Sequence, residues 1–147
     1  MKTLLWLYLA GQLLFVNPPA NIAPPEIDGT VNQMYSVPAA LLVYAHENLA
    51  GGEFYELQDG DNVTAVFTDG TSALYEVAFY GIYIARSTVT AKGGGDFEVR
   101  LNNQGEWLMI SDVITQHNTK GSILLYTCFG GNVTTGRLFV RLVEVER

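Results

Sequence analysis

Three residues with reactive or charged side chains stand where predicted strands begin or end. Cys128 closes an apolar run of strand length at residues 123–127, and His46 follows a similar run at residues 41–45. Arg137 opens the last apolar run of the sequence. A thiol at the end of a core strand is accessible, whereas a cysteine with only a packing role usually sits within the strand. We therefore expect these three residues to form a reactive site.

These side-chain types can support nucleophilic catalysis by a cysteine. A thiol attacks as the thiolate, and a neighbouring imidazolium or guanidinium lowers the pKa of the thiol. His46 could donate a proton to a leaving amine, and Arg137, a permanent cation, could stabilise a developing oxyanion. If Cys128 ends one strand and Arg137 begins its hairpin partner, both residues lie at the same end of the sheet.

The thiol and its histidine partner have alternatives. Cys128 could be an inert core cysteine, because free cysteines are usually buried. His117, in the polar segment at residues 115–119, could be the partner instead of His46. We prefer His46 because histidines in polar surface segments are ordinary.

The cation has alternatives as well. Arg137 could pair with a carboxylate near the end of the chain, and Arg141 shares the face of Arg137 by strand alternation, so either arginine could supply the cation. Thr127 points to the opposite face from Cys128, and its hydroxyl could order the adjoining loop. We add Thr127 and Arg141 to the predicted site as substrate-binding residues.

The elements around these residues are short strands separated by Gly and Asp. Residues 62–68 alternate with period two, which places Val63, Ala65 and Phe67 on one face, and Asp69-Gly70 follows as a hairpin signal. Further strands are expected at residues 41–45, 72–89, 97–101, 107–110, 122–127 and 137–145. The one convincing helical segment is short, at residues 53–57. Seven or eight strands with almost no helix predict an all-β barrel or sandwich.

Length and composition limit the function classes. The chain has 147 residues, of which 48% are hydrophobic and 16% charged, so one core is expected and two ordinary domains are not. A net charge of -7 offers no basic surface for phosphates, and we expect no nucleic-acid partner. One cysteine excludes an internal disulfide, and with two histidines we expect no metal and no other cofactor.

The N-terminus has features of a targeting segment. Lys2 precedes an apolar run at residues 4–16, and a Pro-rich stretch follows at residues 18–25. The run is shorter than the roughly 20 residues that span a bilayer, but it suits an export signal. A first strand or helix lying on the core is the structural alternative. We expect residues 1–25 to be an export signal or membrane-proximal anchor with a linker, and residues 26–147 to be the folded domain.

Several motifs in this order resemble the sortase family of cysteine transpeptidases. Residues 124–128 read Leu-Leu-Tyr-Thr-Cys, where the family has Thr-Leu-x-Thr-Cys, and residues 137–141 read Arg-Leu-Phe-Val-Arg, where it has an R-x-x-V-R-like run. Upstream, Ala45-His46 precedes Gly-Gly-Glu-Phe at residues 51–54 and Leu-Gln-Asp-Gly-Asp at residues 57–61, which are similar to the family's histidine segment. Leu124 departs from the family's usual Thr.

The resemblance implies a closed sortase-like β-barrel of seven to eight strands with one or two short helices. It also implies a reaction in which Cys128 attacks the carbonyl between Thr and Gly of a Leu-Pro-x-Thr-Gly-like sorting peptide, after which an amine acceptor resolves the thioester. Such an enzyme would be extracytoplasmic, secreted or anchored at the cell surface. A hydrolytic cysteine peptidase on the same site and a non-enzymatic peptide-binding barrel are the competing interpretations.

Overall fold

The computed structural model describes residues 3–18, 27–34, 41–86, 97–102, 104–128 and 136–145, and most of these residues are in strands. In chain order the strands are β1 (Leu4–Leu9), β2 (Gln12–Asn17), β3 (Thr30–Met34), β4 (Leu41–Tyr44), β5 (Asn62–Phe67), β6 (Ser72–Ala85), β7 (Glu98–Leu101), β8 (Leu108–Met109), β9 (Ile123–Cys128) and β10 (Gly136–Glu144). A 3-10 helix, η1 (Ala50–Glu56), follows β4, and the α-helix α1 (Ile110–His117) precedes β9.

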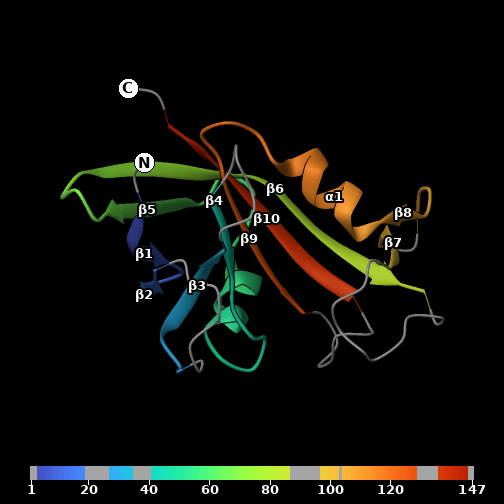
Figure 1. Cartoon of the computed structure of the whole chain (residues 1–147), viewed down its shortest axis with the longest axis horizontal. Helices are drawn as coiled ribbons and strands as arrows, with labels where there is room; N and C mark the ends of the chain where they lie inside the picture. Colours follow the sequence, from blue (N-terminus) through green and yellow to red (C-terminus); the bar gives the residue numbers. More distant parts are fainter. Residues whose placement is uncertain are drawn as a thin grey trace.

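Eight of these strands form a closed ring. Hydrogen-bonded neighbours follow the order β10-β9-β4-β3-β2-β1-β5-β6, and β6 pairs again with β10. From the end of β6, strands β7 and β8 extend the sheet beyond the ring (Figure 1). The pairs β2–β3 and β4–β9 are parallel. The predicted mostly β, closed barrel of seven or eight strands with short helices is therefore confirmed.

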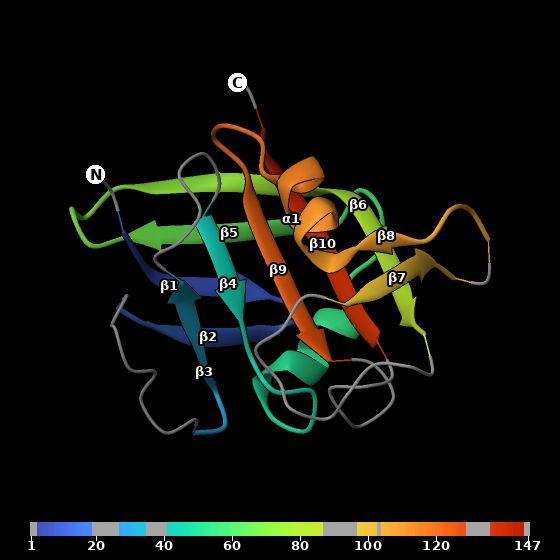
Figure 2. The same cartoon turned by 45° about the vertical axis from the view of Figure 1, so that its right-hand side comes forward.

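Side-chain alternation gives the sheet two apolar faces. Leu125 and Val140 belong to the large cluster inside the barrel, whereas Leu124 and Phe139 belong to a second cluster on the outer face. Helix α1 lies over this outer face and contributes Val113 to the second cluster (Figure 2). Successive strand residues point to opposite faces, so each strand of this region packs on both sides.

Five apolar residues of the predicted strands, Leu42, Val63, Phe67, Leu125 and Val140, are all buried, but one of them lies on the other face. The barrel interior contains Val63, Phe67, Leu125 and Val140. Leu42 is only 4% exposed, yet it belongs to the outer cluster, because its neighbour Val43 takes the inward position on β4.

The apolar run at the N-terminus, which the sequence pattern predicted to be an export signal or anchor, is part of the barrel, and most of the predicted Pro-rich linker lies outside the described residues. Residues 4–17 form the antiparallel pair β1–β2, and β1 also pairs with β5. The inward side chains Leu7, Leu9 and Val16 are at most 1% exposed. Burial of these side chains contributes to the same core as the rest of the barrel, so the structural alternative for this run, a strand on the core, is the one observed.

Helix α1 is an element that the sequence pattern did not predict. The expected strand at residues 107–110 is only the two-residue β8, and the helix begins directly after it. The buried residues of α1 are Val113 and His117, a spacing of four that suits one face of a helix. Among the described residues, no helix is long and apolar enough to cross a membrane.

Candidate active site

Strand β9 carries Cys128 at its end and lies between β4 and β10. On one side, β9 is antiparallel to β10, and Cys128 is paired with Arg137. On the other side, β9 is parallel to β4, with Tyr126 paired with Tyr44. The Ala45 N–H still donates to the Tyr126 carbonyl, so His46 follows directly after this parallel pairing, near the end of β9 that carries Cys128. The three predicted catalytic residues therefore lie at the same end of three adjacent strands.

The direction of the backbone hydrogen bonds shows how closely Cys128 and Arg137 face each other. The Ala45 N–H donates to the Tyr126 carbonyl at 3.4 Å, so alternate carbonyls of β9, including that of Cys128, point toward β4. Cys128 and Arg137 consequently form a non-hydrogen-bonded antiparallel pair, the kind in which Cα atoms are only about 4.5 Å apart and side chains are closest.

His46 is exposed and lies against an aromatic residue of its own strand. The Tyr44 hydroxyl is 3.2 Å from Nε2 of His46, and the two rings meet edge to face with centroids 5.5 Å apart. Val43 and Ala45 point into the barrel, so Tyr44 and His46 alternate to the outer face. Cys128 is on this outer face as well, because Leu125 and Thr127 point inward.

Arg137 is half-buried, and its guanidinium is held by an aromatic ring. Its Cζ is 5.0 Å from the centroid of Phe97, and one NH group donates to the Gly136 carbonyl at 2.8 Å. Gly136 is needed at this point because a Cβ would collide with the Tyr83 carbonyl of β6. The close approach of β10 to β6 therefore fixes the start of the strand that carries Arg137.

An aromatic stack lies beneath the three residues. Tyr126 stacks on Tyr44 with ring centroids 5.3 Å apart and on Phe139 at 5.7 Å. Burial raises the pKa of Tyr126 to about 12, against the opposing effect of the Arg137 cation. Tyr126 is therefore a neutral part of the site at physiological pH.

Thr127 is inside the barrel, which corrects its prediction as a substrate-binding residue. Its side chain is fully buried, and its hydroxyl donates to the Ala45 carbonyl at 2.6 Å. Gly51 packs against this hydroxyl and against the carbonyls of Ala45 and His46, leaving no room for a Cβ. Thr127 thus joins β9 to the residue before His46, and it has no open face toward a substrate.

Tyr55 is a site neighbour that the sequence did not predict. Its hydroxyl donates to the Cys128 carbonyl at 2.6 Å and also lies 3.1 Å from a carboxylate oxygen of Glu47. Burial, followed by the hydrogen bond to Glu47, raises the pKa of Tyr55, so the hydroxyl keeps its proton. No local pattern in the sequence could have indicated this contact, because Tyr55 and Cys128 are 73 positions apart.

Arg141 and His117 form a separate buried group under α1. Nδ1 of His117 accepts from Arg141 at 3.3 Å, and Nε2 lies 3.3 Å from the Tyr83 hydroxyl. Arg141 pairs with Leu124, four residues before Cys128, or about 13 Å along the strand. Arg141 therefore contacts His117 rather than the thiol. His117, far from being a loop histidine, ends α1 and is 4% exposed.

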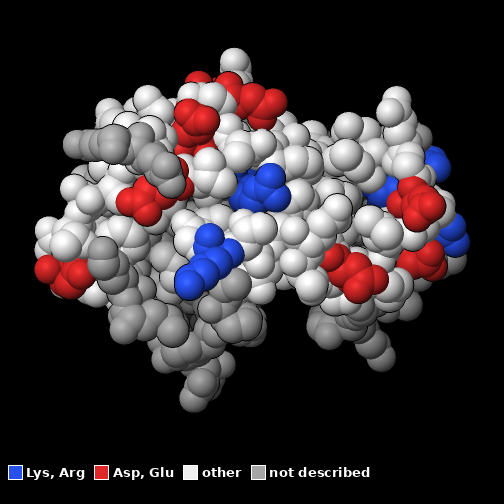
Figure 3. Space-filling view, turned by 90° about the horizontal axis from the view of Figure 1, so that it is seen from above, with Lys and Arg blue, Asp and Glu red and all other residues white. Residues whose placement is uncertain are grey.

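Among the described residues, no group of three or more His, Cys, Asp or Glu residues could hold a metal ion. Figure 3 views the molecule from above, on the side away from the end of β9, and shows both acidic and basic residues on that face.

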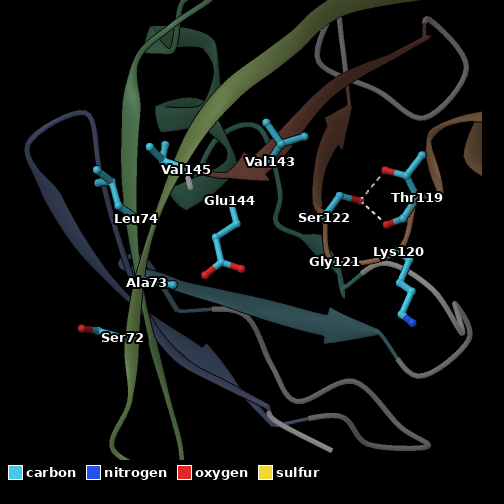
Figure 4. A pocket seen from close by; sticks show the side chains of 10 residues that line it. All are labelled: Ser72, Ala73, Leu74, Thr119, Lys120, Gly121, Ser122, Val143, Glu144 and Val145. Atoms are coloured by element: carbon cyan, nitrogen blue, oxygen red, sulfur yellow. Dashed lines mark hydrogen bonds between the residues drawn. The ribbon is translucent and has the colours of Figure 1, made fainter. Parts of the chain in front are cut away.

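A large surface depression lies at the opposite end of β9 from Cys128. It has a volume of about 880 Å³ and is lined by residues of the β6 start, the β10 end and the turn before β9: Ser72, Ala73, Leu74, Thr119, Lys120, Gly121, Ser122, Val143, Glu144 and Val145. Figure 4 shows the Ser122 hydroxyl bonded to Thr119, whose carbonyl accepts at 2.6 Å. Because Ser122 precedes β9 and Cys128 ends it, this depression is not part of the thiol site.

Comparison with solved structures identifies the architecture. Sortase A from Corynebacterium diphtheriae matches with a TM-score of 0.60 at 14% identity, over 100% of this chain and 63% of that one. Listeria monocytogenes sortase A matches with a TM-score of 0.59 at 17% identity, over 97% and 88% of the two chains. Clostridium perfringens sortase C with the C-terminal cell wall sorting motif matches with a TM-score of 0.55 at 14% identity, over 99% and 72%.

No protein-family model matches the sequence, and no curated protein sequence matches it. The chain spans less than two thirds of the length of the C. diphtheriae protein. At these identities the likeness concerns architecture, and it agrees with the resemblance of the motifs around Cys128, His46 and Arg137. This chain has the sortase fold.

Proposed function

We propose that this protein is a sortase-type cysteine transpeptidase in which Cys128 is the nucleophile, His46 the proton donor and acceptor, and Arg137 the oxyanion-stabilising cation. The observation that supports this most strongly is the register of three adjacent strands. Arg137 is paired with Cys128 on one side of β9, and His46 follows β4, the strand that pairs with β9 on the other side. All three side chains alternate to the outer face.

In the proposed reaction the Cys128 sulfur attacks a peptide carbonyl carbon, and a carbon–sulfur bond forms as the carbonyl oxygen takes up negative charge. Arg137 donates hydrogen bonds to this oxygen. When the carbon–nitrogen bond breaks, His46 gives its proton to the leaving amine, which leaves a thioester on Cys128. An acceptor amine then attacks the thioester, His46 takes up the amine proton, and the Cys128 thiolate is released.

The proposed substrate is a peptide or protein with a sorting-type motif, and the proposed second substrate is an amine. The solved C. perfringens sortase C, whose structure includes its C-terminal cell wall sorting motif, supports this substrate class by similarity of fold. An extracytoplasmic location at the cell surface fits such a reaction. A hydrolytic peptidase would use the same thioester with water in place of the amine.

Acceptor dependence tests the proposal. We would incubate the protein with a library of Leu-Pro-x-Thr-Gly-like peptides, with and without triglycine, and analyse the products by mass spectrometry. The proposal predicts a triglycine-ligated product that is lost in Cys128→Ala. Cleavage that gives the same free acid at every triglycine concentration would show a peptidase, and an inert library would favour a non-enzymatic barrel.

A further inference from the structure

The parallel pairing of β4 and β9 ends just before the residues of the proposed site. Leu41 N–H donates to the Ser122 carbonyl, and Ala45 N–H donates to the Tyr126 carbonyl. The same pattern, continued by two residues, would direct the Cys128 carbonyl to the N–H of Glu47. Strand β4, however, ends at Tyr44, and the chain turns after His46 toward η1.

The Tyr55 hydroxyl occupies the position at which this backbone hydrogen bond would have continued. It donates to the Cys128 carbonyl at 2.6 Å from the last turn of η1. The backbone of η1 is itself fixed nearby, because the Gly51 N–H donates to the His46 carbonyl and the Leu57 N–H donates to the Phe54 carbonyl. The Tyr55 side chain, on η1, thus holds the end of β9 where β4 no longer pairs with it.

We propose that Tyr55 is a positioning residue for the nucleophile: its hydroxyl replaces the missing β4 partner and fixes the peptide unit of Cys128 between His46 and Arg137. This inference deepens the proposed function and rests on it for its catalytic consequence. Losing a hydrogen bond to a part-buried backbone carbonyl costs free energy, so we expect the end of β9 to shift when the Tyr55 hydroxyl is removed. Such a shift moves the sulfur relative to both neighbours.

The Glu47 carboxylate increases the expected effect of removing the Tyr55 hydroxyl. Its carboxylate oxygen and the Cys128 carbonyl oxygen both lie within hydrogen-bond distance of the same Tyr55 hydroxyl. Both are acceptors, so without the hydroxyl between them they repel each other. Replacing the carboxylate by an amide supplies an N–H donor, which could reach the Cys128 carbonyl in the space that the hydroxyl leaves.

The kinetic test compares Tyr55→Phe with Tyr80→Phe. Both variants remove one hydroxyl from a half-buried tyrosine, but the Tyr80 hydroxyl bonds to the Tyr55 backbone and not to Cys128. We expect Tyr55→Phe to lower kcat for peptide transfer roughly 10-fold with KM within about twofold, because the loss concerns the geometry of attack. Tyr80→Phe should stay within about threefold of the parent. Adding Glu47→Gln to Tyr55→Phe should recover most of the lost rate.

A spectroscopic test is independent of the proposed function. The chain has one cysteine, so carbon-13 labelling of cysteine carbonyls gives a single carbonyl resonance, that of Cys128. A hydrogen-bonded carbonyl resonates downfield of an unbonded one. We expect the signal to move upfield in Tyr55→Phe, to return in Tyr55→Phe with Glu47→Gln, and to stay in place in Tyr80→Phe.

The two tests separate the possible failures. An unchanged resonance in a folded Tyr55→Phe protein would overturn the inference, whatever the activity. A shifted resonance with transfer as fast as in the parent would refute the positioning role while leaving the proposed function intact. If the parent itself transfers no peptide, the proposed function fails, and the resonance alone decides whether Tyr55 holds Cys128.

Discussion

The outer face of the barrel carries two sets of a histidine and an arginine, and the two sets have opposite environments. His46 is exposed at the end of β4, and Arg137 is half-buried at the start of β10, with Cys128 between them in the strand register. His117 and Arg141 lie further along the same face under α1, where Arg141 donates directly to the ring of His117.

The second set shows what a structural histidine looks like in this fold. Burial, followed by the Arg141 cation, lowers the pKa of His117 to about 4, so the ring is neutral at physiological pH. Because Nδ1 accepts from Arg141, the proton is on Nε2, which can donate to Tyr83. A ring with both nitrogens engaged and only 4% of its residue surface exposed is not placed to exchange protons with a substrate. Residue type alone therefore does not distinguish the sets, but their position on the strands does.

Exchanging each arginine for lysine is expected to give the largest difference between the two sets. We expect Arg137→Lys to lower transfer 100-fold to 1,000-fold, about 2.7–4 kcal/mol, because an ammonium cannot reproduce the planar fork of donors around an oxyanion. Arg141→Lys should leave transfer by the folded protein within about threefold. Initial rates of peptide transfer measure both variants. Equal losses would mean that Arg141, or neither arginine, supplies the cation.

A second comparison concerns the hydroxyl groups that stabilise each region. Thr127→Val leaves the Ala45 carbonyl without its buried donor, and we expect it to lower the free energy of unfolding by about 1–3 kcal/mol. The control is Thr115→Val in α1, whose hydroxyl donates to the Ser111 carbonyl on the exposed side of the helix. We expect the control to change stability by no more than about 0.5 kcal/mol. Urea denaturation checks both values, and similar costs would contradict the buried role of Thr127.

The two histidines should differ in how they affect stability with pH. Folding lowers the pKa of His117 from 6.5 to about 4, so the unfolded chain binds more protons over that interval. Stability is therefore lost as pH falls from about 6.5 toward 4, and by pH 5 the loss is up to about 2 kcal/mol. In His117→Gln this part of the pH dependence should disappear.

His46→Gln is the matched control, because the exposed His46 ring is not part of the buried group. Urea denaturation at pH 7.5 and pH 5 gives the change in unfolding free energy for each variant, and the difference from the parent removes the contribution of the carboxylates. If His46→Gln, and not His117→Gln, flattened the pH dependence, the assignment of the two environments would be reversed.

The barrel, and the position of Cys128, His46 and Arg137 at strand ends, could be predicted because each depends on a local pattern. Cys128 and Arg137 stand at the ends of apolar runs that become β9 and β10, and strand pairing brings such ends together. Strands β1 and β2 were harder to predict, because the outward residues Tyr8 and Leu13 are apolar and hide the period of two. That run therefore had the composition of an export signal.

The contacts that support the site could not be predicted, because they join distant parts of the chain. The Thr127 hydroxyl reaches a carbonyl 82 positions away, and neither residue is unusual in its own segment. The role of His117 was also hidden, since the neighbouring Thr115 and Gln116 are polar and exposed while His117 itself is buried beneath the helix. Closure of the barrel and docking of α1 decide these contacts, and both are tertiary events.

Intact-mass spectrometry of the protein during turnover tests the central claim most directly. With a cleavable Leu-Pro-x-Thr-Gly-like peptide and no amine, we expect an adduct with the mass of the peptide up to its Thr on Cys128, formed in the parent and in His117→Gln. Triglycine should discharge this adduct into a ligated peptide, and Cys128→Ala should never acquire it. An adduct that persists in Cys128→Ala, or one that forms in His46→Gln as fast as in the parent, would contradict the account.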